Sequence, residues 1–258
     1  MTKEFDKDGL SGLHMEVEDL DPTVECLPQA EIDARMRASS WHGSVHADYM
    51  GQGYYETQVE LVCLADNGHW DEILSEFQKG YLNISPNSFN PDEHSWNTLV
   101  HKAAKSGVGA DVVQQLIDAG GWRCIVNAKG ERPIDLARQH HHEHLYQVLE
   151  PVIRHPCAED ELMAVQTKFH ELIKKFADDL EIDLQGWFRF PELNVIQELV
   201  KPEMECAVSG MYGGFEYRLE FRNGSPVLIT EYFSRICSGS EELYEVTSEG
   251  YQLIEGEW

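Results

Sequence analysis

The densest group of chemically active side chains in the sequence is the run His140-His141-His142-Glu143-His144. His140 and His144 lie one helical turn apart, a spacing at which two imidazoles can share a metal ion. No cysteine or further histidine stands beside the run at ligand spacing. The pattern therefore favours histidines that bond to the protein or to water, and we expect neither a metal nor a cofactor here.

Three other stretches approach catalytic motifs without completing them. His170-Glu171 begins like a zinc-protease helix, but Lys174 stands where the second histidine would be. The glycine-rich stretch 210–214 is followed by no Gly-Lys-Ser or Gly-Lys-Thr, and a turn or bulge before a strand suits it better than a phosphate loop. The sequence contains no Gly-x-Ser-x-Gly elbow. These departures predict a protein that is not an enzyme.

An enzyme site in the C-terminal part of the chain is the alternative. Such a site would need a cavity between a helix at 159–180 and the strands after it. The cavity would have to hold titratable groups with shifted pKa values, for example Arg218, Glu220, Glu231 or Tyr232.

Two stretches of the chain share a pattern at a period of 34 residues, set by Ala103 and Ala137. The first reads Thr-Leu-Val-His-Lys-Ala over 98–103, and the second reads Arg-Pro-Ile-Asp-Leu-Ala over 132–137. Gly107 and an apolar stripe at 112–117 follow the first stretch, as a helix end and a second helix would require. This pattern resembles the ankyrin repeat, whose signature is Thr-Pro-Leu-His-x-Ala at a period of about 33 residues. With a weaker copy at 61–77, the resemblance covers residues 57–153.

Two side chains of the first copy have a physical role in this reading. The hydroxyl of Thr98 can cap the helix that follows, and both nitrogens of His101 can tie neighbouring turns together. The copies also depart from the signature: Leu99 replaces the proline, Arg132 the threonine and Asp135 the histidine.

The resemblance implies that the protein binds another protein. Repeats of this family build a rigid surface, and they often bind through hairpin tips and inner helices. On that analogy, the candidate contact residues are Lys102, Lys105, Trp122, Lys129 and Arg138. The alternative for each of them is an ordinary position on the repeat surface.

The sequence after residue 153 predicts a different architecture. Apolar residues recur at three- and four-residue spacing over 159–180, as in a long amphipathic helix. From residue 204 the period changes to two, and Asn223-Gly224 is a strong hairpin signal. We therefore predict an α+β protein in which a short ankyrin-like stack precedes a long helix and an antiparallel sheet. The expected divisions are an acidic segment at 1–28, a helical region at 29–153 that begins with a helix over 29–50, and an α+β module at 154–258.

The net charge and the cysteines of the chain limit the classes of partner and the cellular compartment that we expect. The chain holds 46 acidic and 20 basic residues, for a net charge of −26. Such a charge repels nucleic acid and anionic lipid, and it favours a basic protein partner. An acidic immunity or inhibitor protein that masks a basic target is thus a second function to consider. The chain has no long apolar run and no secretory pattern at its start, and its six cysteines are scattered without Cys-x-x-Cys. We expect a cytoplasmic location.

The repeat pattern makes a prediction about Ala103 and Ala137. If each alanine lies between paired helices, replacing either one with leucine overpacks the stack and costs roughly 1–3 kcal/mol. Urea denaturation of Ala103→Leu and Ala137→Leu measures this cost. Unchanged midpoints for both variants would contradict the reading of these stretches as stacked helix pairs.

Overall fold

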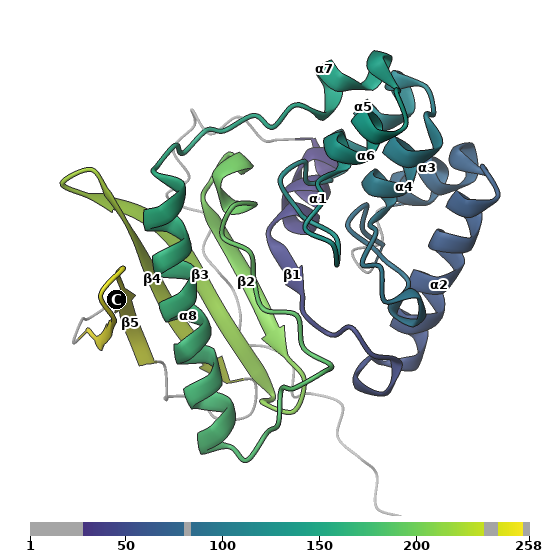
Figure 1. Cartoon of the computed structure of the whole chain (residues 1–258). Coiled ribbons are helices and arrows are strands. Elements are labelled where there is room, and N and C mark those ends of the chain that lie inside the picture. Colours follow the sequence, from purple (N-terminus) through teal and green to yellow (C-terminus); the bar gives the residue numbers. More distant parts are fainter. Residues whose placement is uncertain (1–27, 80–83, 235–241, 255–258) are drawn as a thin grey trace, which may run out of the picture.

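The chain is an α+β protein whose helix pairs lie beside a six-stranded sheet (Figure 1). The computed structural model describes residues 28–79, 84–234 and 242–254. Within these residues, no helix combines the length and the apolar character needed to cross a membrane.

Three helix pairs stack in chain order over residues 52–149. The first helices of the pairs contact one another in the order α2, α4, α6, and the second helices do so in the order α3, α5, α7. A 3₁₀ turn, η3 (Glu143–Leu145), opens the last helix. The bounds are α2 (Gln52–Asp66), α3 (Trp70–Gln78), α4 (Leu99–Ser106), α5 (Ala110–Asp118), α6 (Pro133–Gln139) and α7 (Tyr146–Leu149).

The residues of the repeated pattern occupy the positions that a close-packed stack requires. Ala103 and Ala137 are completely buried in the core shared by the three pairs. The Thr98 hydroxyl accepts the amide of His101, and Gly107 ends α4 at a φ of 65°.

His101 links α4 to the turn before α6. Its Nδ1 accepts the backbone amide of Thr98 at 3.2 Å, so the ring proton lies on Nε2 and is donated to the carbonyl of Glu131 at 3.0 Å. The ring is completely buried. The expected tie between neighbouring turns is thus confirmed.

The sheet runs in the order β1-β2-β3-β4-β5-β6. Strands β2 to β6 pair antiparallel in sequence order, whereas β1 pairs parallel with β2. Asn223 and Gly224 join β3 to β4 with φ values of 54° and 90°, as a two-residue hairpin turn requires. The bounds are β1 (Ser40–His42), β2 (Glu203–Val208), β3 (Gly213–Arg222), β4 (Ser225–Ser234), β5 (Glu242–Val246) and β6 (Tyr251–Leu253).

The helix α8 (Glu159–Asp179) covers one face of the sheet, where sequence periodicity predicts a long helix. Phe169 meets Phe215 edge-on, with ring centroids 5.9 Å apart, and Phe176 stacks on Tyr232 at 4.7 Å. These rings fill the space between α8 and the sheet, so the enzyme cavity considered there is replaced by packed core.

The segment 29–50 differs from the single helix that we predict for it. The helix α1 (Gln29–Ala38) ends early, and the chain then forms β1, in which Trp41 aligns with Cys206 of β2. The chain forms a strand here because it buries Trp41, which is 3% exposed and whose ring packs in the core of the sheet and α8. The helical region therefore contributes a strand to the C-terminal sheet.

The loop between α5 and α6 also packs against the C-terminal part of the chain. The Glu198 carboxylate accepts the amides of Arg123 and Cys124 at 2.9 and 2.5 Å. The Asn194 amide donates to the carbonyl of Cys124 at 2.8 Å. Burial raises the pKa of Glu198, and the nearby Arg123 guanidinium opposes that shift. Side chains from the segment between α8 and β2 thus form hydrogen bonds with the backbone of the loop between α5 and α6, and these bonds join the helix pairs to the C-terminal part of the chain.

The buried His101 predicts how stability depends on pH. Burial lowers its pKa to about 3 from the ordinary value of 6.5, so below pH 6.5 the unfolded chain binds a proton that the native state rejects. The resulting loss of folding stability is absent at pH 7 and grows as the pH falls from 6.5 toward 3. It amounts to about 2 kcal/mol at pH 5.

Urea denaturation at pH 7 and pH 5, for the wild type and for His101→Gln, measures that loss. The stability lost between the two pH values should be smaller in the variant by this amount. An identical loss in both proteins would show that His101 does not carry the effect.

Candidate functional site

Two of the five candidate contact residues are buried, which corrects the expectation for them. Trp122 is 3% exposed, stacks on Trp41 with ring centroids 5.6 Å apart, and donates its indole N–H to the carbonyl of Ala38. Lys102 is held by the carboxylates of Asp66 and Glu93, at 2.8 and 3.1 Å. Neither side chain can meet a partner, because each is already part of an internal contact.

The other three candidates are exposed and lie on separate elements of the stack. Lys105 is on α4, Lys129 is in the turn before α6, and Arg138 is on α6. Arg138 contacts the carboxylates of Asp135 and Glu150 at 3.6 and 3.5 Å. None of these three lines the large cleft described below.

The histidine run fastens the last helix pair to the pair before it. His142 Nε2 lies 3.1 Å from the carbonyl of Lys105, and His144 Nε2 lies 3.0 Å from that of Val108. In the part of the chain that the structure describes, no three His, Cys, Asp or Glu side chains are grouped to hold a metal ion.

The four residues named for an enzyme site divide between the two faces of the sheet, and on the outer face Arg218 donates to Glu220 at 2.8 Å. Tyr232 faces α8, where it stacks on Phe176. Arg218 and Glu231 line the cleft on the opposite face of the sheet. Strand alternation separates them, because successive side chains point to opposite faces.

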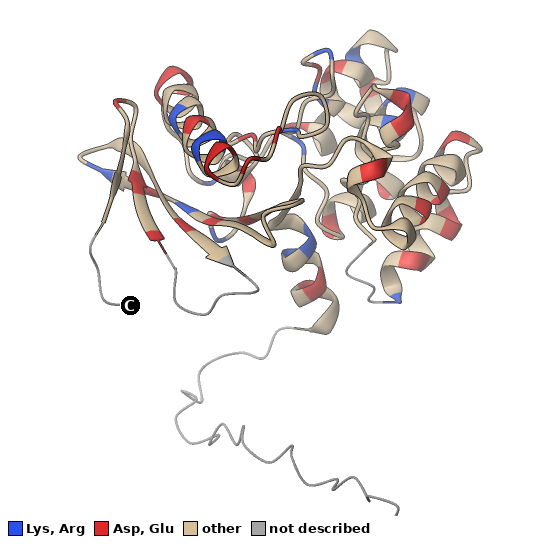
Figure 2. Cartoon of the chain, turned by 90° about the horizontal axis from the view of Figure 1, so that it is seen from below, with Lys and Arg blue, Asp and Glu red and all other residues tan. Residues whose placement is uncertain are grey.

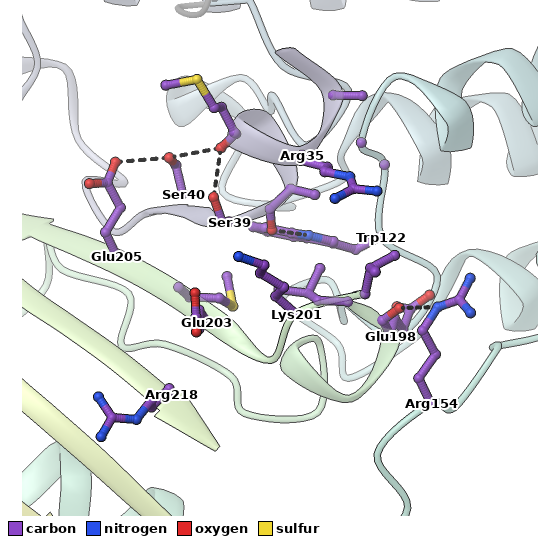
Figure 3. Close-up of a pocket in the computed structure, with 18 of the residues that line it drawn as sticks. Arg35, Ser39, Ser40, Trp122, Arg154, Glu198, Lys201, Glu203, Glu205 and Arg218 are labelled. Carbon is purple, nitrogen blue, oxygen red and sulfur yellow. Dashed lines mark hydrogen bonds between the residues drawn. The ribbon is translucent and has the colours of Figure 1, made fainter. Parts of the chain in front are cut away.

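A cleft of about 1000 Å³ lies on that opposite face of the sheet. Its walls come from α1, from the loop Gly120 to Arg123, from residues 152–154, and from the segment 198–205 with the outer face of β2 to β5. Figure 2 shows α8 on one side of the sheet and α1 on the other. Figure 3 shows labelled residues from each of these walls around the cleft.

Three glutamates stand in a row across the floor of the cleft. Glu205 of β2 is directly opposite Glu216 of β3, and Glu216 is directly opposite Glu231 of β4. Residues directly opposite each other on neighbouring strands have Cβ atoms about 4.5–5.5 Å apart, so the glutamates of the row are neighbours on the outer face. Like charges placed opposite each other destabilise a sheet. We therefore expect the row to lower the stability of the sheet.

Polar contacts tie the row to the wall above it. The Ser40 hydroxyl lies 2.9 Å from a carboxylate oxygen of Glu205 and 3.1 Å from the carbonyl of Met36 (Figure 3). Ser40 is also opposite Glu205 in the β1–β2 pairing. The end of α1 is thereby fixed against the floor of the cleft.

The rim of the cleft carries three exposed apolar side chains. Met36, Val152 and Val200 are 48%, 46% and 57% exposed, among the most exposed large apolar side chains of the described residues. Exposed apolar side chains grouped around a concavity are typical of binding sites.

The lining of the cleft is rich in carboxylates and includes no histidine and no cysteine among the described residues. Its carboxylates can accept hydrogen bonds and neutralise positive charge, while its apolar rim can bury the remainder of a ligand.

Comparisons with known proteins find no matching family model, no matching curated protein and no matching solved structure.

The glutamate row makes a prediction about stability. Replacing Glu216, the middle residue, with glutamine removes both like-charge contacts of the row. We expect the Glu216→Gln variant to be more stable than the wild type by roughly 0.2–1 kcal/mol at low salt. Urea denaturation of the variant and of Glu249→Gln, which removes an exposed glutamate elsewhere, tests this. Added salt should shrink the gain, and a loss of stability would show that Glu216 is held by attractive contacts.

Proposed function

We propose that this chain is a non-enzymatic protein that binds another protein through the cleft between α1 and the outer face of the sheet. The observation that carries the proposal is the cleft itself. Its volume of about 1000 Å³, apolar rim and charged floor suit the side chains of a polypeptide.

The resemblance of the helix pairs to ankyrin repeats supports a role as a scaffold. The hairpin tip next to Trp122 is engaged by the chain itself, since Glu198 and Asn194 hold the backbone of 123 and 124. A partner that used the repeats would thus be limited to surfaces such as Lys105 and Lys129. The cleft offers a deeper and more varied surface.

The immunity or inhibitor function receives less support. Such a protein would gather its acids on one face, but Figure 2 shows Asp and Glu on the helices of both parts of the chain as well as on the sheet. Cys63, Cys124, Cys157 and Cys206 are free thiols, which supports a reducing compartment such as the cytoplasm.

A photo-crosslinking amino acid placed at Val200, on the rim of the cleft, tests the proposal in cells that make the protein. Met163 on α8 is the matched control, because it is 50% exposed and lies across the sheet from the cleft. We expect a protein to be captured from position 200 and not from position 163. With that partner purified, Val200→Asp should weaken binding at least about tenfold, the effect of a central interface residue, and Met163→Asp should not.

Two results would overturn the proposal. Capture of the same proteins from positions 200 and 163 would show that contact at the cleft is not selective. Capture from Lys105 or Lys129 but not from position 200 would place the binding surface on the repeats.

A further inference from the structure

We propose that the cleft receives a segment of the partner that carries lysine or arginine, with its cations on Glu205 and Glu216. This inference rests on the proposed function and adds the chemistry of the ligand.

The two glutamates are presented to the cleft without ionic partners of their own. Both are exposed on the outer face of the sheet, and both line the cleft. Among the described residues, no basic group lies within 4.0 Å of either carboxylate, and the Ser40 hydroxyl is the described side chain that meets Glu205. Two adjacent carboxylates of this kind form a ready acceptor for one guanidinium or ammonium group.

The neighbouring part of the sheet shows what the fold does when it neutralises its own acids. Arg218 is opposite Glu203 and donates to Glu220 at 2.8 Å, and Arg222 pairs with Glu245. The fold thus supplies a cation to Glu220 and one to Glu245, which lie on the same face as the row. Because like charges opposite each other are unfavourable, a cation from outside is the natural partner of Glu205 and Glu216.

The basic residues of the cleft do not offer an equally good site for an acidic ligand. Arg35 is paired with Glu31 at 2.7 Å, and Arg154 donates to the carbonyl of Glu198 at 3.1 Å. Lys201 is exposed at the mouth, next in sequence to the apolar Val200. An anion that entered would face the carboxylates of the floor, and the chain as a whole carries −26.

The apolar rim indicates which groups accompany the basic residues of the ligand. Met36, Val152 and Val200 present apolar surface above the carboxylates. The long aliphatic stems of lysine and arginine, or aliphatic residues between them, can cover that surface. The structure thus favours a segment in which basic and aliphatic residues are interspersed.

Binding of defined peptides to the full chain tests this inference. The probe is a fluorescein-labelled decapeptide with three lysines interspersed among leucine and serine, and the comparison peptide has glutamate in place of each lysine. Anisotropy is measured at about 0.15 M salt, where screening limits long-range attraction to about 8 Å. The variant is Glu205→Gln/Glu216→Gln. The matched control, Glu60→Gln/Glu249→Gln, removes two exposed glutamates that do not line the cleft.

We expect the lysine peptide to bind the wild type more tightly than the glutamate peptide does. Its Kd should rise at least tenfold in the cleft variant and less than twofold in the control. Carbodiimide crosslinking should attach the lysine peptide to Glu205 or Glu216, as peptide mapping by mass spectrometry can determine. Thermal unfolding of both variants verifies that each is folded.

Three outcomes would overturn the inference. An equal rise in the Kd of the lysine peptide in the two variants would mean that the peptide responds only to the net charge of the protein. A preference for the glutamate peptide would assign the cleft to an acidic segment, and binding of neither peptide would exclude a basic one. In each case, selective capture of a partner from position 200 would leave the proposed function standing, so the two failures are distinguishable.

Discussion

Burial of the Arg189 guanidinium between two indole rings joins the helix pairs to the sheet. Arg189 is 5% exposed, and its guanidinium carbon lies 5.0 Å from the ring centre of Trp41 and 5.1 Å from that of Trp96. Its remaining donors reach the Glu192 carboxylate and the carbonyl of Val126. A buried charge of this kind is strongly destabilising when it loses a partner. Because Trp41 lies in β1, Trp96 precedes α4 and Arg189 follows α8, separating these segments would take both indole rings and the Val126 carbonyl away from the guanidinium and leave only the Glu192 carboxylate among these partners.

This joint determines which surfaces of the chain are buried and which are left open. Trp122 stacks on Trp41, so the tip of the hairpin between the helix pairs becomes part of the joint instead of a contact surface. On one face of the sheet, α8 is packed through Phe169 and Phe176. The outer face of β2 to β5 is left to line the cleft with α1. The cleft, unlike the surface of the helix pairs alone, therefore exists only after the helices and the sheet have joined.

The parts of the fold that follow from local patterns could be predicted from the sequence. Periodicity gives α8, Asn223-Gly224 gives the β3–β4 turn, and the spacing of Ala103 and Ala137 gives the stacked helix pairs. The strand β1 could not be predicted, because its pairing partner lies some 160 residues later and three residues carry almost no periodic signal.

The candidate site was missed for the same reason. The alternation at 215–221 places Glu216 on the solvent face of a strand, but only the register between strands brings Glu205 and Glu231 beside it. The burial of Trp122 could not be predicted, because an aromatic residue at a hairpin tip has the same sequence signature whether it meets a partner or the chain's own core.

The helix stack has a further role in the candidate site, because it supports the wall of the cleft that α1 forms. Gly120, with a φ of 105°, lies so close to α1 that an added Cβ would come within 2.5 Å of the carbonyl of Ala34. This close approach of backbone to backbone packs α1 directly against the stack, so the stack supports the wall of the cleft that α1 forms.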